Sequence, residues 1–312
     1  MIIFPKRDVI PIIVPQICFK DRYDNMNNYA EMNPSLFIEE DGTTTILVRC
    51  VNYKKFNNKH FTLYQAYSNS VYYLLKGKIA DGLKVDVDNF EYHLIEPIFN
   101  LPNYPTYWFG LEDIRFINSN TILTIVPQLN EGGSPSIFKA ELNDNKITNF
   151  THCKPNKVEK NWMPYTYNHV SRVIYSLAPF IIKSIETDDM QEITVSDIIR
   201  DKLAGYHGST NGMPFLQEQG DGWFLFLVHV NREKTYHRML LFNAITNDIQ
   251  LSDEFIFFKN PYIEFTCSLS KYNDRIFITI GVNDDKAYII ETCTEDIKSV
   301  FPEPLTGGAK LY

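Results

Sequence analysis

Leu111-Glu112-Asp113-Ile114-Arg115-Phe116 opens a short unit of sequence in which two carboxylates lead into an apolar run. A turn at residues 118–120 follows, and then a second run, Thr121-Ile122-Leu123-Thr124-Ile125-Val126. Runs that are rich in β-branched and aromatic residues and bounded by Asn, Asp or Gly predict strands. The unit therefore predicts two strands joined by a tight turn.

The same order of anchor, run, turn and second run occurs four more times. The further anchors are Asn33-Pro34-Ser35-Leu36-Phe37, Lys160-Asn161-Trp162-Met163-Pro164-Tyr165, Asn211-Gly212-Met213-Pro214-Phe215 and Glu264-Phe265-Thr266-Cys267-Ser268. The five anchors start at residues 33, 111, 160, 211 and 264, so successive starts are 78, 49, 51 and 53 residues apart. A period near fifty residues built from strand pairs is typical of β-propeller blades. We therefore expect an all-β, five-bladed β-propeller with an insertion after the first blade and an axial active-site funnel where the anchors meet.

Composition agrees with one large folded unit. The chain has 312 residues, of which 44% are hydrophobic, and no low-complexity linker divides it, so we expect a single propeller domain over 1–312. Only residues 195–203 predict a helix, with Ser196 as its N-cap. Aromatic residues make up 14% of the chain, which suits strands and also suits a carbohydrate site.

Charge, cysteines and missing motifs exclude several classes of protein. A net charge of −8 argues against nucleic acid or an anionic membrane as partner. The five cysteines are odd in number and widely spaced, without CxxC, which predicts neither a disulfide framework nor a zinc site. No apolar run reaches transmembrane length, so we expect no membrane insertion and a cytoplasmic location. GxGxxG, GxxxxGK[ST] and GxSxG motifs are absent, and we expect neither cofactor nor metal.

The second anchor carries the residues best suited to acid–base chemistry. Strand alternation places Asp113 and Arg115 on one face, and Glu112 and Ile114 on the other. A cation beside an acid can fix its rotamer and tune its proton affinity, as a general acid requires. A structural Asp–Arg pair at the entry to a strand remains the alternative.

Two further groups of polar residues stand near anchors. Lys160-Asn161-Trp162 combines a cation, an amide and an indole that could bind an anion or a polyol, although a solvated lysine beside a packed tryptophan would look the same. His229, Tyr236, His237 and Arg238 flank one connection between strands. The spacing of the two histidines does not match the HExxH pair of a zinc enzyme.

Taken together, the anchors resemble glycoside hydrolase family 130 and its relatives, five-bladed propellers that include β-mannoside phosphorylases, β-mannosidases and β-mannosyltransferases. The likeness spans about residues 30–292 and is greatest to a divergent branch found with glycosyltransferase-type proteins. The motifs that carry it are Met32-Asn33-Pro34-Ser35, Val48-Arg49-Cys50-Val51-Asn52-Tyr53, Leu111-Glu112-Asp113-Ile114-Arg115, Glu159-Lys160-Asn161-Trp162-Met163-Pro164-Tyr165, Val228-His229-Val230, Tyr236-His237-Arg238, Ile263-Glu264-Phe265 and Gly281-Val282-Asn283-Asp284.

The resemblance implies roles for individual residues. It makes Asp113 the general acid, acting directly or through a substrate hydroxyl, in a reaction that inverts the anomeric carbon. The residues that it places around the sugar are Asn33, Arg49 and Asp284, with Lys160 on the phosphate side and His229 at a polar position of the fourth blade. Ile114 stands where the family has proline, a change that a strand entry tolerates.

One departure from the family bears on the reaction. The third-blade run at residues 175–179 lacks the His-Arg pair that surrounds inorganic phosphate in the phosphorylases, and the run at 122–128 lacks an arginine. A phosphate dianion needs several charge-assisted donors. A β-mannoside phosphorylase is therefore the alternative, behind glycosyl transfer or hydrolysis.

Transfer and hydrolysis require different partners for Asp113. Inverting hydrolysis needs a second carboxylate to activate water, for which Glu264 is the first candidate and Glu112 the second. Transfer needs a site for a sugar phosphate or nucleotide sugar, and we expect Lys160, His229, His237 and Arg238 to form its positive wall. The other residues that we expect to contact an oligosaccharide substrate are Glu112, Arg115, Asn161 and Tyr236.

A non-catalytic glycan-binding propeller and a protein-interaction propeller rank lower, because the distinctive polar residues lie at the anchors.

Overall fold

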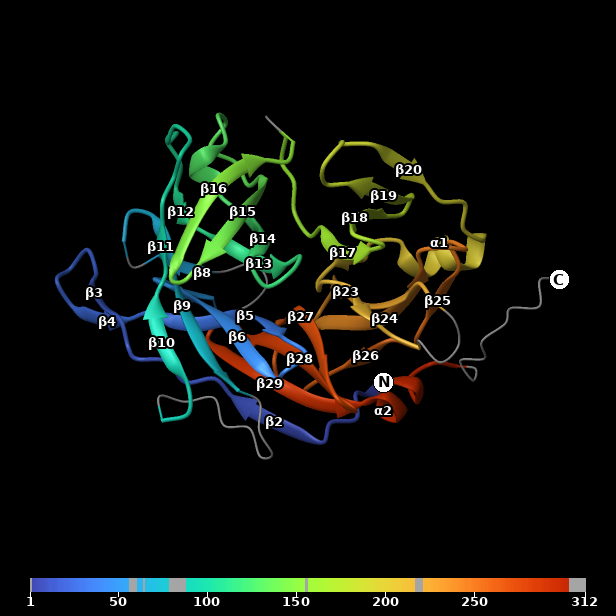
Figure 1. Ribbon diagram of the computed structural model, residues 1–312. Helices are drawn as coiled ribbons and strands as arrows, with labels where there is room; N and C mark the ends of the chain where they lie inside the picture. Colours follow the sequence, from blue (N-terminus) through green and yellow to red (C-terminus); the bar gives the residue numbers. More distant parts are fainter. Residues whose placement is uncertain are drawn as a thin grey trace.

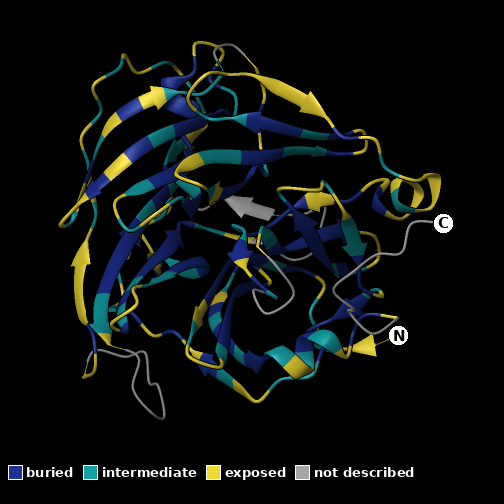
Figure 2. Cartoon of the chain, turned by 45° about the vertical axis from the view of Figure 1, so that its right-hand side comes forward, coloured by how far each residue is buried: buried dark blue, intermediate teal, exposed yellow. Residues whose placement is uncertain are grey.

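A computed structural model of the chain describes residues 2–55, 61–63, 65–78, 88–154, 157–216 and 221–302. It consists mainly of strands, and the sheets form a propeller-like ring (Figure 1). The prediction of an all-β fold is confirmed. In Figure 2, buried residues run through the longer strands, while exposed residues gather on loops and on short outer strands.

Within the described ranges, five sheets have four or more strands, and we number them by the anchors. Sheet 1 contains β10 (Glu91–Leu94), β9 (Ser68–Lys78), β6 (Thr43–Val51) and β5 (Ala30–Ile38), with β12 (Trp108–Gly110) beside β9. Sheet 2 contains β11 (Glu96–Pro97), β16 (Lys146–His152), β15 (Ile137–Asn143), β14 (Thr121–Ile125) and β13 (Glu112–Phe116). Sheet 3 contains β17 (Met163–Tyr167), β18 (Val170–Leu177), β19 (Phe180–Ser184) and β20 (Met190–Glu192).

The remaining two sheets include segments from the N-terminus. Sheet 4 contains β1 (Ile2–Ile3), β26 (Phe255–Ile256), β24 (Thr235–Asn243), β23 (Trp223–Asn231) and β21 (His207–Gly208), with β22 (Met213–Pro214) on β23 and β25 (Ile249–Leu251) on β24. Sheet 5 contains β2 (Asp8–Pro11), β29 (Lys286–Cys293), β28 (Arg275–Val282) and β27 (Glu264–Tyr272). Two small hairpins pair β3 (Cys18–Lys20) with β4 (Met26–Asn28), and β7 (Tyr53–Lys55) with β8 (Phe61–Leu63).

The strands that begin at the anchors lie at one edge of their sheets and contact one another. β5 contacts β27 and β13, β13 contacts β17, and β22 contacts β27. Two contacts show that β5 and β13 run in the same direction. The Asn33 amide donates to Asp113 in the first half of both strands, and the Phe37 and Phe116 rings lie 5.6 Å apart near their ends. The anchors therefore meet at the centre, with the strand starts at one end and the strand turns at the other.

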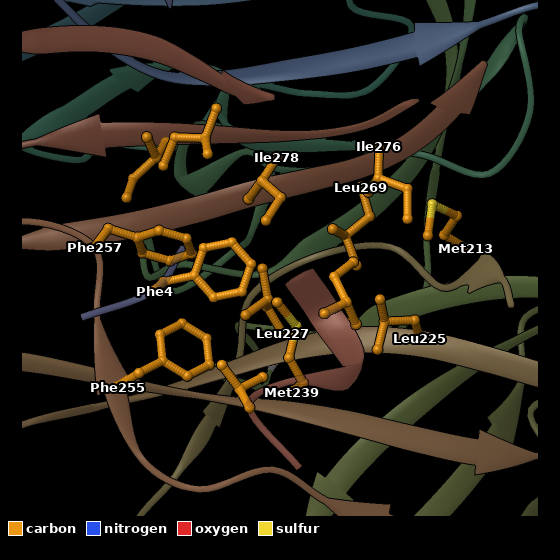
Figure 3. Packing of buried hydrophobic residues seen from close by; sticks show 14 of the residues in the cluster. Phe4, Met213, Leu225, Leu227, Met239, Phe255, Phe257, Leu269, Ile276 and Ile278 are labelled. Carbon is orange, nitrogen blue, oxygen red and sulfur yellow. The ribbon is translucent and has the colours of Figure 1, made fainter. Parts of the chain in front are cut away.

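Five hydrophobic clusters fill the spaces between neighbouring sheets. They join sheet 1 to sheet 2, sheet 2 to sheet 3, sheet 3 to sheet 4, sheet 4 to sheet 5 and sheet 5 back to sheet 1. Figure 3 shows the cluster between sheets 4 and 5, where Phe4 packs with Phe255 and Phe257. Each sheet thus buries both faces against its neighbours, which a single strand pair could not do alone.

The helices in the described ranges are short. α1 (Asp197–Leu203) confirms the predicted helix, and the Ser196 hydroxyl accepts the Ile199 N–H as its cap. α2 (Thr294–Lys298) and the 3₁₀ turn η1 (Pro127–Leu129) were not predicted, because a single turn leaves almost no periodic pattern.

Candidate functional site

Asp113 lies at a bulge in the first strand of sheet 2. Glu112 pairs with Ile125 and Arg115 pairs with Leu123, so the register shifts between them. Asp113 takes φ of 46°, a left-handed conformation that aspartate tolerates better than most residues. The predicted alternation of Glu112 and Asp113 is wrong as a result, since both carboxylates reach the same arginine.

Arg49, on β6, connects the two carboxylates. Its Nη2 lies 2.8 Å from Glu112 Oε1, its Nη1 lies 3.3 Å from Asp113 Oδ1, and its Nε donates to Ser70 Oγ at 2.9 Å. Asn33, itself at φ of 41°, donates to the same Oδ1 at 3.0 Å. Asp113 Oδ2 has no partner among the described residues, and its side chain is 16% exposed. One oxygen is therefore fixed, and the other is left for a substrate.

The surroundings of Asp113 favour its ionised form. Burial alone would raise the pKa of this carboxyl, but Arg49 and Arg115, with the Asn33 hydrogen bond and the nearby Lys160, outweigh it and place the pKa below its usual 3.8. Asp113 is therefore a carboxylate at neutral pH.

Arg115 of sheet 2 and polar groups of sheet 4 extend this centre. Arg115 is buried, and its Nε donates to the Ser209 carbonyl, while the Ser209 hydroxyl bonds to His229 Nδ1 at 2.7 Å. Burial, with His237, His207 and Arg115 nearby, lowers the pKa of His229 to about 3, so the imidazole is neutral. Sequence reasoning missed Ser209 and His207, which lie shortly before the fourth anchor.

Three other predicted residues lie at the same end of the ring. Asp284 follows β28 at φ of 51°, and the pKa of the buried Tyr53 hydroxyl is raised by burial with Asp284, Glu112 and Asp113 around it. Lys160 is exposed, and Asn161 takes φ of 62° at the start of sheet 3. These residues surround the Asp113 end of the axis.

Glu264 does not occupy a position suited to activating water. It is 2% exposed, and its two oxygens accept the backbone N–H groups of Phe257 and Phe258 at 2.9 and 2.7 Å. His237 Nε2 lies 3.3 Å from the same carboxylate. Glu264 therefore holds the connection after β26 in place, and the expectation that it activates water is not supported by its position.

The expected positive wall does not form. Tyr236 and Arg238 point to the sheet 3 side of β24, where Tyr236 packs in the core and Arg238 donates to the Ser252 carbonyl. His237 points to the opposite face, is fully buried and lies against Phe255 and Phe257. Adjacent residues of a strand face opposite ways, so only Lys160 and the neutral His229 remain near Asp113.

Two cavities adjoin the central strands. The larger, of about 1060 Å³, lies at the turn end, between Phe37, Phe116, Tyr165 and Tyr272, opposite the Asp113 end. The smaller, of about 530 Å³, lies at the Asp113 end between sheets 1 and 2. The two carboxylates therefore lie away from the 1060 Å³ cavity and on the side of the smaller one.

Metal and membrane sites find no support in the described ranges. Their His, Cys, Asp and Glu side chains form no group of three or more that could hold a metal ion. Their helices are all too short or too polar to span a bilayer.

Comparison with known proteins gives a likeness in structure and none in sequence. No family model and no curated protein matches the chain. The solved structures include a β-1,2-mannobiose phosphorylase from Listeria innocua in complex with β-1,2-mannobiose, 13% identical, with a TM-score of 0.55 over 91% of this chain and 98% of that one. They also include a GDP-Man-dependent mannosyltransferase from Leishmania mexicana, 13% identical, with a TM-score of 0.56 over 99% and 93%.

A third similar structure comes from work on glycoside hydrolases of family GH130 that target β-1,2 mannosidic linkages in Candida mannan. It is 12% identical, with a TM-score of 0.57 over 98% of this chain and 95% of that chain. The matches cover nearly the whole length of both chains. At this identity the likeness establishes a shared fold, and it confirms the resemblance to the mannoside phosphorylases and their relatives at that level.

Proposed function

We propose that this protein is an inverting carbohydrate-active enzyme that forms β-mannoside-type bonds by glycosyl transfer, and that each of its five larger sheets is one blade of a single five-bladed propeller. The five core clusters that join the sheets in a closed circle support the blade count. The fold shared with mannoside-active enzymes supports the substrate class.

The observation that carries the proposal is the state of Asp113. Its Oδ1 is fixed by Asn33 and Arg49 while Oδ2 has no partner among the described residues, so the carboxylate can meet a substrate in one orientation. By microscopic reversibility, the general acid of bond cleavage is the general base of bond formation. Because the pKa of Asp113 is lowered, the ionised form needed for bond formation predominates at neutral pH.

The transfer step can be written with these groups. The acceptor hydroxyl oxygen forms a bond to the anomeric carbon of the donor, and the bond from that carbon to the donor phosphate breaks with its electron pair on phosphate. The hydroxyl proton passes to Asp113, directly or through a substrate hydroxyl. Attack from the face opposite the phosphate inverts the configuration, and Lys160 is the exposed cation placed to meet the phosphate charge.

Hydrolysis and phosphorolysis have less support. Glu264 is engaged by two backbone N–H groups, and Glu112, the remaining carboxylate beside Asp113, is bound to Arg49. Arg49 donates to Ser70, Glu112 and Asp113, and Arg115 donates through Nε and Nη1 to backbone carbonyls, so that within the described ranges Arg115 Nη2 alone of these two guanidinium groups is left as a donor for inorganic phosphate.

The first test is a substrate screen. We would incubate the purified protein with GDP-mannose, mannose 1-phosphate or β-1,2-mannobiose, with and without phosphate and acceptor sugars, and read the product anomer by NMR. We expect transfer from one of the activated donors with inversion. Sugar binding without turnover in any reaction would favour the non-catalytic glycan-binding alternative.

The Asp113→Asn variant tests the proton-transfer role. Asparagine keeps the shape and still accepts from Asn33, but it cannot take a proton, so turnover should fall by about 10²–10⁴. The melting temperature should change little, because Glu112 still pairs with Arg49. Both quantities should be measured on one preparation. Unchanged turnover would exclude Asp113 as the proton carrier, and a large fall in melting temperature would favour the structural-pair alternative.

A further inference from the structure

The smaller cavity has the composition of a sugar subsite. It lies between sheets 1 and 2, holds about 530 Å³ and is lined by Tyr67, Ser70, Tyr72, Phe99, Phe109 and Gln128, among others. That volume falls within the range of about 300–1,000 Å³ usual for small-molecule sites, which are mostly apolar with a few placed polar groups.

This cavity, which we call the aromatic cleft, adjoins the Asp113 centre. Ser70 Oγ accepts the Arg49 Nε–H, and the other nitrogens of Arg49 hold Glu112 and Asp113. The short strand β12 pairs with β9 and contributes Phe109 and Gly110 to the cleft, and this close pairing requires glycine because a Cβ at Gly110 would lie 2.0 Å from the Ser70 carbonyl oxygen. Arg49 thus links the cleft to the reacting centre through its hydrogen bonds.

The rim of the cleft presents an aromatic face. Tyr67 is 44% exposed, and its ring meets Phe109 edge-on at 5.1 Å. Holding one ring against another fixes its orientation, so that its open face can pack on the C–H surface of a pyranose.

Inside the cleft, Gln128 supplies hydrogen-bond donors. Its Oε1 accepts the Gly110 N–H at 2.6 Å, which fixes the orientation of the amide. Its Nε2 has no acceptor among the described residues, although the side chain is nearly buried at 7% exposure. A wholly apolar occupant would leave these N–H groups unsatisfied, whereas a sugar hydroxyl would accept from them.

We propose that the aromatic cleft binds a further sugar unit of an oligosaccharide whose reacting end lies at Asp113. The inference rests on the proposed function and names its substrate class: chains longer than a disaccharide. Tyr67 packs on the ring face of that unit, and Gln128 donates to its hydroxyls.

The test compares two chain lengths. Calorimetric titration with β-1,2-mannobiose and β-1,2-mannotetraose should show that the wild-type protein binds the tetraose about tenfold more tightly. Tyr67→Ala and Gln128→Glu, which keeps the acceptor for Gly110 and removes the donors, should each weaken tetraose binding about fivefold or more and leave mannobiose binding within about twofold. Tyr67→Phe should retain wild-type binding, because it keeps the ring.

Tyr92→Ala is the matched control, since Tyr92 is 43% exposed and also meets a second ring, Tyr73, edge-on at 6.2 Å. It should change neither affinity. If Tyr67→Ala lowered the affinity for both sugars equally, or lowered neither, the proposed subsite would be overturned. This holds even if the protein turns over mannosides. Conversely, tetraose binding through Tyr67 without any turnover would overturn the proposed function and keep the subsite, and failure to bind either sugar would overturn both.

Discussion

Asp113 combines two properties that determine how the site can work. The residue sits in a strained backbone conformation at a bulge, and its carboxylate is held by a buried arginine and an amide. Such an arrangement fixes geometry and charge together. As a consequence, the pKa of the Asp113 carboxyl is lowered, which favours its action as a proton acceptor and disfavours its action as a proton donor.

The direction of the reaction should therefore appear in its pH dependence. A base whose pKa lies below 3.8 stays ionised as pH falls, so kcat/KM for transfer should stay level from pH 8 down to about pH 5. For cleavage of a β-mannoside the same group must be protonated, so kcat/KM should rise as pH falls across this range. Both profiles should be recorded over the pH range in which the melting temperature is constant. Transfer that declines steadily from pH 8 to pH 5 would contradict an ionised Asp113.

At the scale of strands, the centre depends on close approach between sheets 1 and 5. A Cβ on Gly281 of β28 would lie 2.3 Å from Asn33 Oδ1 and 2.7 Å from its backbone nitrogen. Asn33 is the residue that holds Asp113, so its placement requires a glycine on the neighbouring sheet.

Gly281→Ala should therefore displace Asn33, lowering turnover and melting temperature together. Gly132→Ala is the control, because a Cβ there meets nothing closer than 3.6 Å and its backbone angle is ordinary. Turnover measured beside thermal unfolding checks the expectation. If Gly281→Ala behaves like the control, the contact relaxes without consequence, and Asn33 is less tightly fixed than its surroundings indicate.

Some features of the strands could be predicted from the sequence and others could not. The repeat of anchors predicted the strands and their meeting at one centre, because blade spacing is a regular property of the chain. Alternation failed at Glu112 and Asp113, because a bulge inserts an unpaired residue that no pattern of hydrophobicity marks. Alternation applied to His237 and Arg238 would have separated them correctly, since β24 is regular across these positions.

At the scale of the whole molecule, the sequence could not predict which end of the axis is open. A cavity of about 1060 Å³ lies at the turn end, lined by residues of all five larger sheets, whereas a cavity of about 530 Å³ adjoins the Asp113 end between sheets 1 and 2. That difference depends on how the sheets sit in the ring, which no single repeat encodes. The aromatic cleft was missed for the same reason, since it forms only where two sheets meet.

The ring itself is closed by residues from the start of the chain. β1 pairs with β26 in sheet 4, and β2 pairs with β29 in sheet 5, so the N-terminal segment joins the last two sheets (Figure 1). Phe4, between these strands, is 1% exposed and packs on Phe255 and Phe257 (Figure 3). The first residues of the chain thus contact strands that lie more than 240 residues away in the sequence.

Phe4→Ala should therefore destabilise the whole ring and not only its own segment. Removing a buried phenylalanine costs about 3–5 kcal/mol, because apolar burial is lost and a cavity remains. The control is Ile3→Ala, whose side chain is 40% exposed and should cost under about 1 kcal/mol. Unfolding in denaturant should be followed simultaneously by circular dichroism and by tryptophan fluorescence, since Trp108 lies on β12, Trp223 lies on β23 and Trp162 packs between sheets 2 and 3. A single shifted transition seen by both probes supports closure of one cooperative ring, whereas an early transition confined to one probe would show that sheets 4 and 5 separate from the rest.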